Sequence, residues 1–390
     1  MNEKLNASEF ISSLCRLIRF CGVLLILGLV FFSAATVTAI TINEFPNAGG
    51  DGGITSGPDG NLWVTLYKGS IGRITTSGIM SSFQTSVALD GITAITKGPD
   101  GNLWFTESIG NKIGRITPEG IIVEFLVPTA GSGPNDITLG PDGNLWFTER
   151  VENKIGRITP QGILTEFNLP SGSILPGGIT SGPDGNVWFT VSFPSRVGRI
   201  TPAGVITEFA VSDVSGFPDS ITTGPDGNLW FIGSSGNIGR ITPAGESTEF
   251  ALPIIPSPPG TYIYKQLGAI TTAPDGNLWF TEQVIVLLPA FFAGSAIVEH
   301  TSWVGRITPS GISTEFAVPT DYSQPTGITV GPDGNIWFTE ARGNKLGQVV
   351  LKQPDAQPMS IPTMTEWGMI IFMVLAGFGA AYFLRDRKVF

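Results

Sequence analysis

Histidine and cysteine, two side chains that often serve as catalytic bases, nucleophiles or metal ligands, are rare in this sequence. Its single histidine, His300, lies at the far end of an apolar segment, where a histidine is more often solvated than catalytic. Both cysteines, Cys15 and Cys21, lie near the N-terminus. The sequence has no phosphate-cradling glycine loop, no Ser-His-Asp arrangement and no His/Cys cluster with metal-ligand spacing. No catalytic motif can therefore be assigned from residue types alone.

Carboxylates are numerous, with 32 Asp and Glu residues, but most of them recur at equivalent positions of one repeated phrase. A glutamate follows Phe-Thr at Glu107, Glu149, Glu282 and Glu340. An aspartate lies in every Pro-Asp-Gly-Asn turn, as Asp142 does in the third copy. Repetition favours a scaffold role, and we expect the glutamates to pair with the arginines of the Gly-Arg-Ile-Thr phrase, Arg115, Arg157 and Arg306.

Polar residues at which the copies differ are better candidates for function, because binding residues concentrate at variable positions on a rigid scaffold. Most of them lie at the start of the first strand of a copy, and we expect them on one face of the fold. The predicted binding-face residues of this kind are Asn135, Asp136, Asp219, Gln324 and Thr326, and the repeated Glu340 is a further candidate.

The repeated phrase organises most of the chain. In one copy it reads GPDGNLWFTE at 140–149, followed by NKIGRITP at 153–160. Its tryptophan recurs at Trp63, Trp104, Trp146, Trp188, Trp230, Trp279 and Trp337. The first five lie 41 or 42 residues apart, and the last two gaps are 49 and 58 residues. Seven copies of such a unit indicate a repeat architecture.

Each copy predicts four short strands and no helix. In residues 137–167 the β-prone runs are 137–139, 145–148, 154–159 and 163–167, separated by turns rich in Pro, Gly and Asn. Apolar residues at helical spacing are missing from these runs. Four antiparallel strands in a unit of this length are typical of a propeller blade. The sequence therefore predicts an all-β, seven-bladed β-propeller over residues 40–352.

The two ends of the repeat region complement each other. The last copy has no strand of the Thr-Glu-Phe kind, and residues 40–45, Ile-Thr-Ile-Asn-Glu-Phe, supply one before the first copy. We expect residues 40–45 to pair with residues 345–351. That pairing would close the ring and remove its open edges.

The sixth copy carries an apolar insertion at residues 283–303. We expect it to extend the hairpin between the second and third strands of that blade. Its exposed apolar side chains favour a docking surface for a partner or for lipid, and the alternative is that it packs flat on its own blade.

The segments outside the repeats predict export and anchoring. Residues 1–39 have a basic start, an apolar run and small residues before Ile40, as in a cleaved signal peptide; the alternative is an uncleaved signal anchor. Residues 353–360 form a linker, and an apolar run with a basic end predicts a membrane helix within 361–390. The net charge of −10 disfavours nucleic acid as a partner.

The phrases Trp-Phe-Thr-Glu, Asn-Lys-Ile-Gly-Arg-Ile-Thr and Ile-Thr-Glu-Phe resemble the repeats of the streptogramin (virginiamycin B) lyase family over about residues 40–352. The resemblance implies a seven-bladed propeller, a histidine base and a metal site acting on a cyclic lactone. It places the family's two histidines at Gly268 and Thr326 and its metal-binding acids at Gln324 and Glu340. Only Glu340 is retained, so Mg²⁺ is expected only if lyase activity is present.

The C-terminal segment is similar to the IPTL-CTERM sorting signal. The matching residues are Ile361, Pro362, Thr363, Glu366 and Trp367, with Met364 where that motif usually has Leu. The resemblance implies an exosortase-like sorting protease as a partner. It also implies an inner-membrane anchor facing the periplasm, followed by release to the cell surface or the medium.

Two classes of function are consistent with the sequence. The first is a binding module that holds an unidentified ligand or protein on the propeller face or on the insertion. The second is a C–O lyase that opens a cyclic lactone with a divalent metal. A general base needs a pKa near the working pH, and neither Gly268 nor Thr326 supplies one. The first class is therefore preferred.

Overall fold

The computed structural model describes residues 40–46, 50, 52–86, 91–170, 172–211, 216–253, 262–288 and 296–351. Residues 1–39 and 353–390 lie outside the described residues, so the signal, linker and sorting segments stay predictions. No helix among the described residues is long and apolar enough to cross a membrane.

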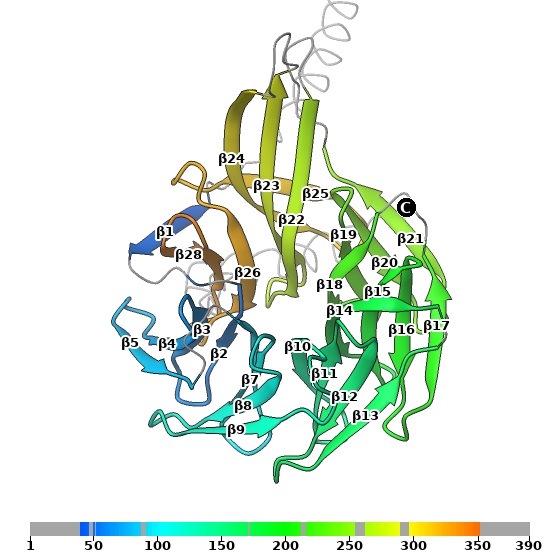
Figure 1. Cartoon of the computed structure of the whole chain (residues 1–390). Helices are drawn as coiled ribbons and strands as arrows, with labels where there is room; N and C mark the ends of the chain where they lie inside the picture. Colours follow the sequence, from blue (N-terminus) through cyan, green and yellow to red (C-terminus); the bar gives the residue numbers. More distant parts are fainter. Residues whose placement is uncertain are drawn as a thin grey trace, which may run out of the picture. The chain divides into compact units, whose positions relative to one another are not determined.

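The described residues form 28 strands in seven four-stranded antiparallel sheets. These sheets are the blades of a propeller (Figure 1). Blade 1 contains β2 (Ile54–Ser56), β3 (Leu62–Leu66), β4 (Ser70–Ile74) and β5 (Met80–Gln84). Blade 2 contains β6 (Ile92–Lys97), β7 (Leu103–Glu107), β8 (Lys112–Ile116) and β9 (Ile122–Leu126). Blade 3 contains β10 (Pro134–Leu139), β11 (Leu145–Glu149), β12 (Lys154–Ile158) and β13 (Leu164–Asn168).

The remaining blades follow the same order. Blade 4 contains β14 (Ile174–Ser181), β15 (Val187–Phe193), β16 (Arg196–Ile200) and β17 (Ile206–Ala210). Blade 5 contains β18 (Pro218–Thr223), β19 (Leu229–Gly233), β20 (Asn237–Ile241) and β21 (Ser247–Ala251). Blade 6 contains β22 (Tyr262–Thr272), β23 (Leu278–Leu288), β24 (Ala296–Ile307) and β25 (Ser313–Ala317). Blade 7 contains β26 (Pro325–Val330), β27 (Ile336–Glu340) and β28 (Lys345–Val350), completed by β1 (Thr41–Pro46).

The pairing of β1 with β28 confirms the predicted closure of the ring. Thr41 lies opposite Val350 and Pro46 opposite Lys345 in an antiparallel register. Blade 7 is thus built from both ends of the repeat region. Its outer edge is formed by the first strand of the chain.

The second strand of each blade forms the core. Leu145–Glu149 is buried along its whole length, because its two faces pack against the two neighbouring blades. This explains why the run Leu-Trp-Phe is continuously apolar instead of alternating. Gly156 on the next strand is required by the packing, since a Cβ there would lie 2.0 Å from the ring of Phe147.

The tryptophan of each copy is held by the aspartate of the preceding turn. In blade 3 the indole Nε1 of Trp146 donates to Asp142 at 2.9 Å, and the ring stacks on Phe167 with centroids 5.5 Å apart. The guanidinium of Arg157 lies over Trp146 and donates to the carbonyl of Pro202 in blade 4 at 2.9 Å. The turn aspartates are therefore structural, as expected.

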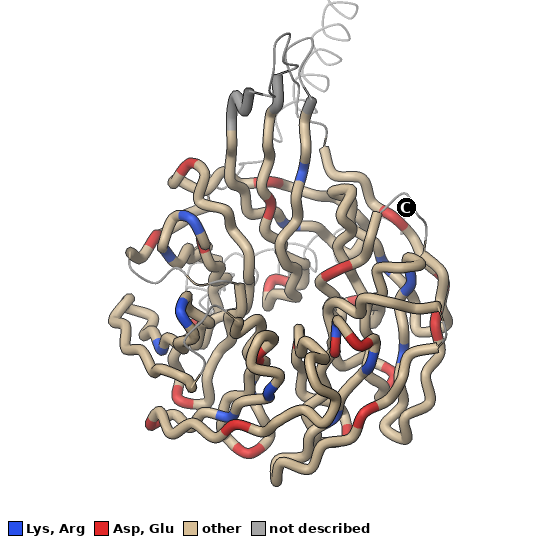
Figure 2. The backbone as a smooth tube through the Cα atoms, viewed as in Figure 1, with Lys and Arg blue, Asp and Glu red and all other residues tan. Residues whose placement is uncertain are grey.

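The expected pairing of the repeated glutamates with the Gly-Arg-Ile-Thr arginines is wrong. The antiparallel register places Glu149 opposite Lys154 and places Arg157 opposite Trp146. Arg157 pairs instead with the turn aspartate, at 3.9 Å from Asp142 Oδ2. Figure 2 shows acidic and basic residues interspersed along the blades.

Blade 6 differs from the other blades by a sheet that extends beyond the ring (Figure 1). The insertion extends β23 and β24 as expected, since Val284 lies opposite Thr301 and Ile285 opposite His300. The innermost strand β22 lengthens with them, with Tyr264 opposite Ile285. The extension therefore has three strands instead of the two predicted, and residues 289–295 between β23 and β24 lie outside the described residues.

Candidate functional site

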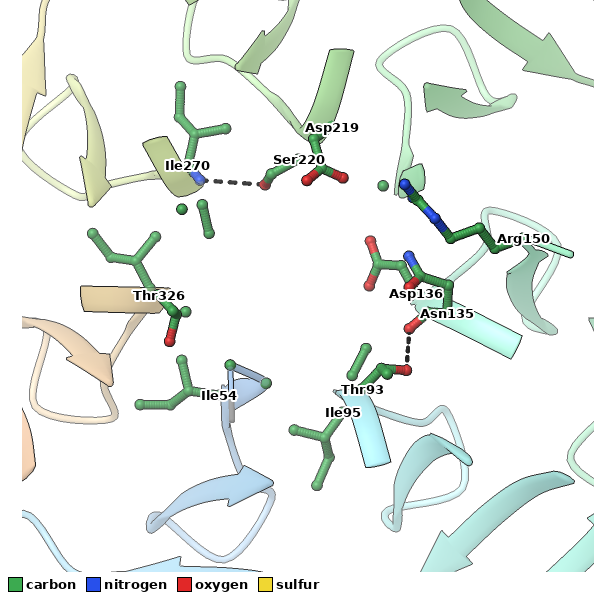
Figure 3. Close-up of a pocket in the computed structure, with 18 residues that line it drawn as sticks. Ile54, Thr93, Ile95, Asn135, Asp136, Arg150, Asp219, Ser220, Ile270 and Thr326 are labelled. Atoms are coloured by element: carbon green, nitrogen blue, oxygen red, sulfur yellow. Dashed lines mark hydrogen bonds between the residues drawn. The ribbon is translucent and has the colours of Figure 1, made fainter. Parts of the chain in front are cut away.

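A cavity of about 500 Å³ lies at the centre of the ring, where the innermost strands begin (Figure 3). Every blade contributes to its wall. Most of the lining residues immediately precede the Ile of an innermost strand, as Asn135 and Asp136 precede Ile137. This is the position at which the sequence predicted a binding face.

A β-bulge explains why these residues reach the cavity. In blade 3, Pro134 lies opposite Glu149 and Ile137 opposite Phe147, so two residues of β10 face one residue of β11. The same irregularity occurs in blades 2, 4, 5, 6 and 7. A bulge leaves the extra residue outside the ladder and re-aims its side chain. It converts variable residues of a regular repeat into the lining of a channel.

A threonine that recurs on the second strand of the blades forms hydrogen bonds between the bulges of neighbouring blades. Thr148 accepts a hydrogen bond from Asp136 N at 3.1 Å and donates to the carbonyl of Gly177 in the next blade at 2.8 Å. Thr190 makes the corresponding bond to the carbonyl of Asp219 at 2.7 Å. Each inner strand is thereby positioned against the next, which makes the channel wall rigid.

The channel has two chemically different walls. Blades 6, 7 and 1 contribute Gly268, Gly327, Gly52 and Gly53, together with isoleucines. Blades 3 and 5 contribute the charged groups Asp136, Arg150 and Asp219, together with Asn135 (Figure 3). The ionisable side chains that line the channel therefore lie on one side of it.

Asp136 is an anchor between two blades. Its Oδ1 accepts from Ile137 N at 2.8 Å, and its Oδ2 accepts from Ile179 N of blade 4 at 2.9 Å. Burial raises the pKa of this carboxyl to about 6, although the two amide donors act in the opposite direction. Both oxygens of the carboxylate therefore accept backbone hydrogen bonds, and its main role is to hold blades 3 and 4 together.

Asp219 and Arg150 are differently placed, because their charged groups are open to the channel. Within the described part of the chain, neither side chain makes a hydrogen bond or an ion pair of 4.0 Å or less. Asp219 is an exposed residue, yet the enclosing ring desolvates its carboxylate and raises its pKa, while the charge of Arg150 lowers it. In Figure 3 the guanidinium of Arg150 points toward Asp219.

The other predicted residues separate into two groups. Thr326 lines the channel, with its hydroxyl 2.8 Å from that of Thr339. Gln324 and Glu340 are not among the residues that line it. The Oε1 atom of Gln324 accepts from Arg342 Nε at 2.9 Å. Of the six predicted residues, the structure brings Asn135, Asp136, Asp219 and Thr326 together around one cavity.

Glu340 is fully buried at the end of β27. Burial, assisted by the nearby charge of Glu44, raises its pKa to about 7 against the opposing influence of Lys345. The three equivalent glutamates, Glu107, Glu149 and Glu282, behave in the same way. Glu340 therefore has the same buried environment as the equivalent glutamates of the other blades, and this environment does not distinguish it as a metal ligand.

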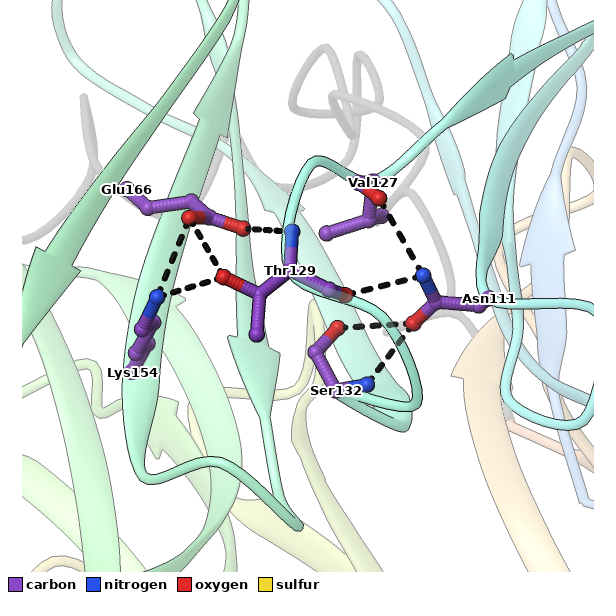
Figure 4. Close-up of polar contacts among 6 residues, drawn as sticks. All are labelled: Asn111, Val127, Thr129, Ser132, Lys154 and Glu166. Atoms are coloured by element: carbon purple, nitrogen blue, oxygen red, sulfur yellow. Dashed lines mark hydrogen bonds and ion pairs between the residues drawn. The ribbon is translucent and has the colours of Figure 1, made fainter.

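A cluster of polar contacts, here called the polar latch, joins neighbouring blades, and Figure 4 shows the latch of blade 3, whose Glu166 and Lys154 act on the pKa of Glu149. In blade 3, Glu166 accepts from the backbone N of Thr129 at 2.9 Å and from its hydroxyl at 2.8 Å, and it pairs with Lys154 at 3.1 Å. Blade 7 repeats the arrangement with Thr320, Glu44 and Lys345. Lysine, and not arginine, is thus the basic residue near the buried glutamate.

Gln324 and Glu340 do not fit a magnesium site. The amide oxygen of Gln324 accepts a hydrogen bond from the guanidinium of Arg342, and Glu340 lies opposite Lys345 in the strand register and has a raised pKa. Mg²⁺ requires several ionised or neutral oxygen ligands in an open octahedral arrangement. No group of three or more His, Cys, Asp or Glu side chains that could hold a metal ion occurs among the described residues.

His300 lies on the extension of β24, and it is not among the residues lining the channel. Its ring contacts Tyr322 edge-on at 4.1 Å, and its Nδ1 is 3.4 Å from Gln283 Nε2. Desolvation and the nearby charge of Arg342 lower its pKa, so it is neutral at pH 7.

Arg150 was not predicted from the sequence. It follows the repeated Phe-Thr-Glu phrase, at a position where other copies have Ser108, Gln283 or Ala341. This variability is the signal in the sequence that could have identified Arg150 as a candidate. Its direction toward the channel depends on the fold and could not be derived from the repeat.

Comparisons with known proteins agree with this architecture. The model of the virginiamycin B lyase family matches residues 36–286 and 269–384. A curated virginiamycin B lyase from Bacillus licheniformis is 53% identical over 36 residues, which is 9% of this chain and 12% of that enzyme. The matched segment therefore spans only a small part of that relative.

Solved structures extend the similarity to the whole ring. Virginiamycin B lyase from Staphylococcus aureus is 36% identical, covers 80% of this chain and 100% of its own, and has a TM-score of 0.67. The same values hold for a catalytically inactive histidine-to-alanine variant of that enzyme with quinupristin. A streptogramin B lyase structure is 33% identical, with coverages of 80% and 98% and a TM-score of 0.66. Because the family model matches well over half of the sequence, this chain belongs to the virginiamycin B lyase family.

Proposed function

We propose that this protein is an exported binding propeller that holds its ligand at the central channel without opening a lactone. The observation that carries the proposal is the distribution of ionisable groups. Asp136, Arg150 and Asp219 lie on one wall, whereas Gly268 and Thr326 occupy the positions at which the resemblance implies catalytic histidines.

The free polar groups of the channel support a binding role. The carboxylate of Asp219 and the guanidinium of Arg150 lack side-chain partners within the described residues. Polar groups held in place by a rigid wall and left without partners are suited to orienting a ligand. The only histidine, His300, contacts Tyr322 on the blade-six extension, and its pKa is lowered.

Lyase activity on a cyclic lactone is the second candidate. It is favoured by the 36% identity to the Staphylococcus aureus enzyme over its full length, and by one buried carboxyl. Glu340 has a pKa of about 7, which is suitable for a general base. Its complete burial and its distance from the channel lining disfavour that role.

One experiment separates the two candidates. The full-length protein is incubated with a type B streptogramin and Mg²⁺, and the mixture is examined by mass spectrometry. We expect the ring of the antibiotic to stay intact. A linearised product would overturn the proposal, and its loss in Glu340→Ala but not in Glu149→Ala, the equivalent buried glutamate of blade 3, would identify Glu340 as the base.

Export and anchoring are part of the proposal and rest on the sequence. We infer that residues 1–39 direct export, that the helix within 361–390 holds the ring at the inner membrane facing the periplasm, and that an exosortase-like protease recognises Ile361-Pro362-Thr363. Mass spectrometry of the mature termini tests both cleavages. A mature protein that begins at Ile40 agrees with this, whereas an intact Met1 contradicts it.

A further inference from the structure

A second cavity, of about 270 Å³, opens beside the channel between blades 4, 5 and 6. Arg150 and Asp219 line both cavities. In Figure 3 they lie on the charged wall of the channel, so the two spaces meet at this pair. Together the cavities fall within the size range of small-molecule sites, roughly 300–1,000 Å³.

Departures of two blades from the repeat build the second cavity. Where most blades have Phe-Thr-Glu, blade 5 has Phe231-Ile232-Gly233, and Ile232 and Gly233 line the cavity. Blade 4 likewise has Val191 in place of the glutamate and then contributes Ser192 and Phe193. The buried carboxylate of blades 2, 3, 6 and 7 is thereby removed from this region, and the floor becomes apolar.

Aromatic rings form the outer wall of this cavity. Phe193, Phe217 and Tyr264 are 41%, 43% and 48% exposed. The rings of Phe193 and Phe217 lie 4.1 Å apart at an angle of 45°. Removing this exposed apolar area from water is favourable. An aromatic group entering the cavity would cover them, and aromatic pairs are favourable in tilted geometry.

The charged end of the cavity offers one cation and one anion that are not paired with each other. A Cβ at Gly177 would lie 3.1 Å from Asp219 Oδ1 and 3.7 Å from Arg150 Nη1. Gly177 therefore leaves room between the two groups. A guanidinium binds a carboxylate through two parallel hydrogen bonds, and a carboxylate binds an ammonium group.

We propose that the joined cavities bind a small zwitterion that carries one aromatic ring, such as a free aromatic α-amino acid. Its carboxylate is bound by Arg150, its ammonium group by Asp219, and its ring lies between Phe193, Phe217 and Tyr264. This inference rests on the proposed binding function of the channel and names the class of ligand.

The test measures binding of four probes to the full-length protein by isothermal titration calorimetry and ligand-observed NMR. The probes are L-phenylalanine, phenethylamine without the carboxylate, 3-phenylpropionate without the ammonium group, and L-alanine without the ring. We expect L-phenylalanine to bind at least tenfold more tightly than each of the others. Equal affinities for L-phenylalanine and L-alanine would overturn the proposal.

Three variants assign the contacts. Asp219→Asn should weaken L-phenylalanine and phenethylamine at least tenfold but leave 3-phenylpropionate unchanged. Arg150→Gln should weaken L-phenylalanine and 3-phenylpropionate but leave phenethylamine unchanged. Phe217→Ala should weaken all three aromatic probes. Tyr322→Ala, which removes an aromatic residue of similar exposure outside the cavity, should change none of them.

The outcomes distinguish this inference from the proposed function. Uniform weakening of every probe in both charge variants would mean that the pair only holds the wall in shape, and it would contradict the assigned contacts. Absence of L-phenylalanine binding, together with an intact streptogramin, would overturn the ligand class alone. A linearised streptogramin would instead overturn the non-catalytic function, whatever the probes show.

Discussion

Glu44 and Lys345, which are separated by almost the whole repeat region, form an ion pair of 2.6 Å. The pair joins the first strand of the ring to the last, and the backbone of Thr320 donates to the same carboxylate at 2.8 Å. Blade 7 therefore uses side chains from both ends of the chain to reproduce the latch that Lys154 and Glu166 form within blade 3.

The closure predicts a large loss of stability when the first strand is removed. Deletion of residues 40–45 exposes the edge of β28 and uncovers Trp337, on which Phe45 stacks with centroids 5.0 Å apart. Thermal unfolding followed by circular dichroism should show a melting temperature lowered by about 10 °C or more, since the loss of a whole strand should cost several kcal/mol and each kcal/mol shifts Tm by roughly 2–4 °C in domains of 150–250 residues. The single change Glu44→Gln should have a much smaller effect, because a partly exposed ion pair contributes about 0–1 kcal/mol. A truncated ring that melts like the intact one would show that the closure is wrong.

The repeated buried glutamates predict a dependence of stability on pH. The carboxyl of Glu149 has a pKa of about 7 in the folded protein and an ordinary value of 4.5, because burial disfavours its charge. Between these values the folded state binds more protons than the unfolded state, so the free energy of unfolding falls as pH rises from about 4.5 through 7. The turn aspartate of the same blade, Asp142, has a lowered pKa and acts only at more acidic pH.

Melting curves between pH 5 and pH 8 test this dependence. Glu149→Gln should melt at a higher temperature than the natural protein at pH 8 and should show a weaker decline across the range. Glu119→Gln, in an exposed turn, serves as the control and should leave the decline unchanged. A steeper decline in Glu149→Gln would contradict the burial argument.

The turn aspartates predict graded losses of stability. Asp142→Ala leaves the buried indole N–H of Trp146 without its acceptor, and an unsatisfied buried donor costs about 1–3 kcal/mol. Asp142→Asn keeps an acceptor oxygen and loses mainly the attraction to Arg157, so it should cost less. Urea unfolding followed by tryptophan fluorescence measures both free energies. Equal losses in the two variants would show that charge, and not the hydrogen bond to the indole, is what stabilises the turn.

The sequence predicted the fold well because one phrase carries all four strands of a blade. The 41- or 42-residue spacing fixed the repeat, and the Thr-Glu-Phe words before the first copy identified the closing strand. Pairing of side chains was less predictable. Glutamate and arginine of neighbouring strands were expected to meet, whereas the antiparallel register sets Glu149 against Lys154.

The candidate site was only partly predictable, for two physical reasons. Asn135, Asp136, Asp219 and Thr326 occupy a variable position of the repeat, and the bulge in each innermost strand carries that position to the channel. Arg150 comes from a loop, and its direction depends on the neighbouring blades. The second cavity is lined by Gly233, at the position where four other blades have a glutamate. A glycine in place of a larger residue forms no sequence motif that would reveal a cavity.

The blade-six extension predicts a segment that can be removed without unfolding the ring. Its described side chains include Ile285 and Val286, which are partly exposed beyond the blade. Replacing residues 285–300 with Asn-Gly shortens β23 and β24 to about the length of their counterparts, for which a two-residue type I′ turn is suitable. The melting temperature should stay within a few degrees of that of the natural protein, because the other blades form without such a segment. In a chain that also lacks residues 361–390, the replacement should lower self-association or membrane retention, as measured by sedimentation with and without vesicles. If the shortened protein unfolds, the extension belongs to the core and the docking role is wrong.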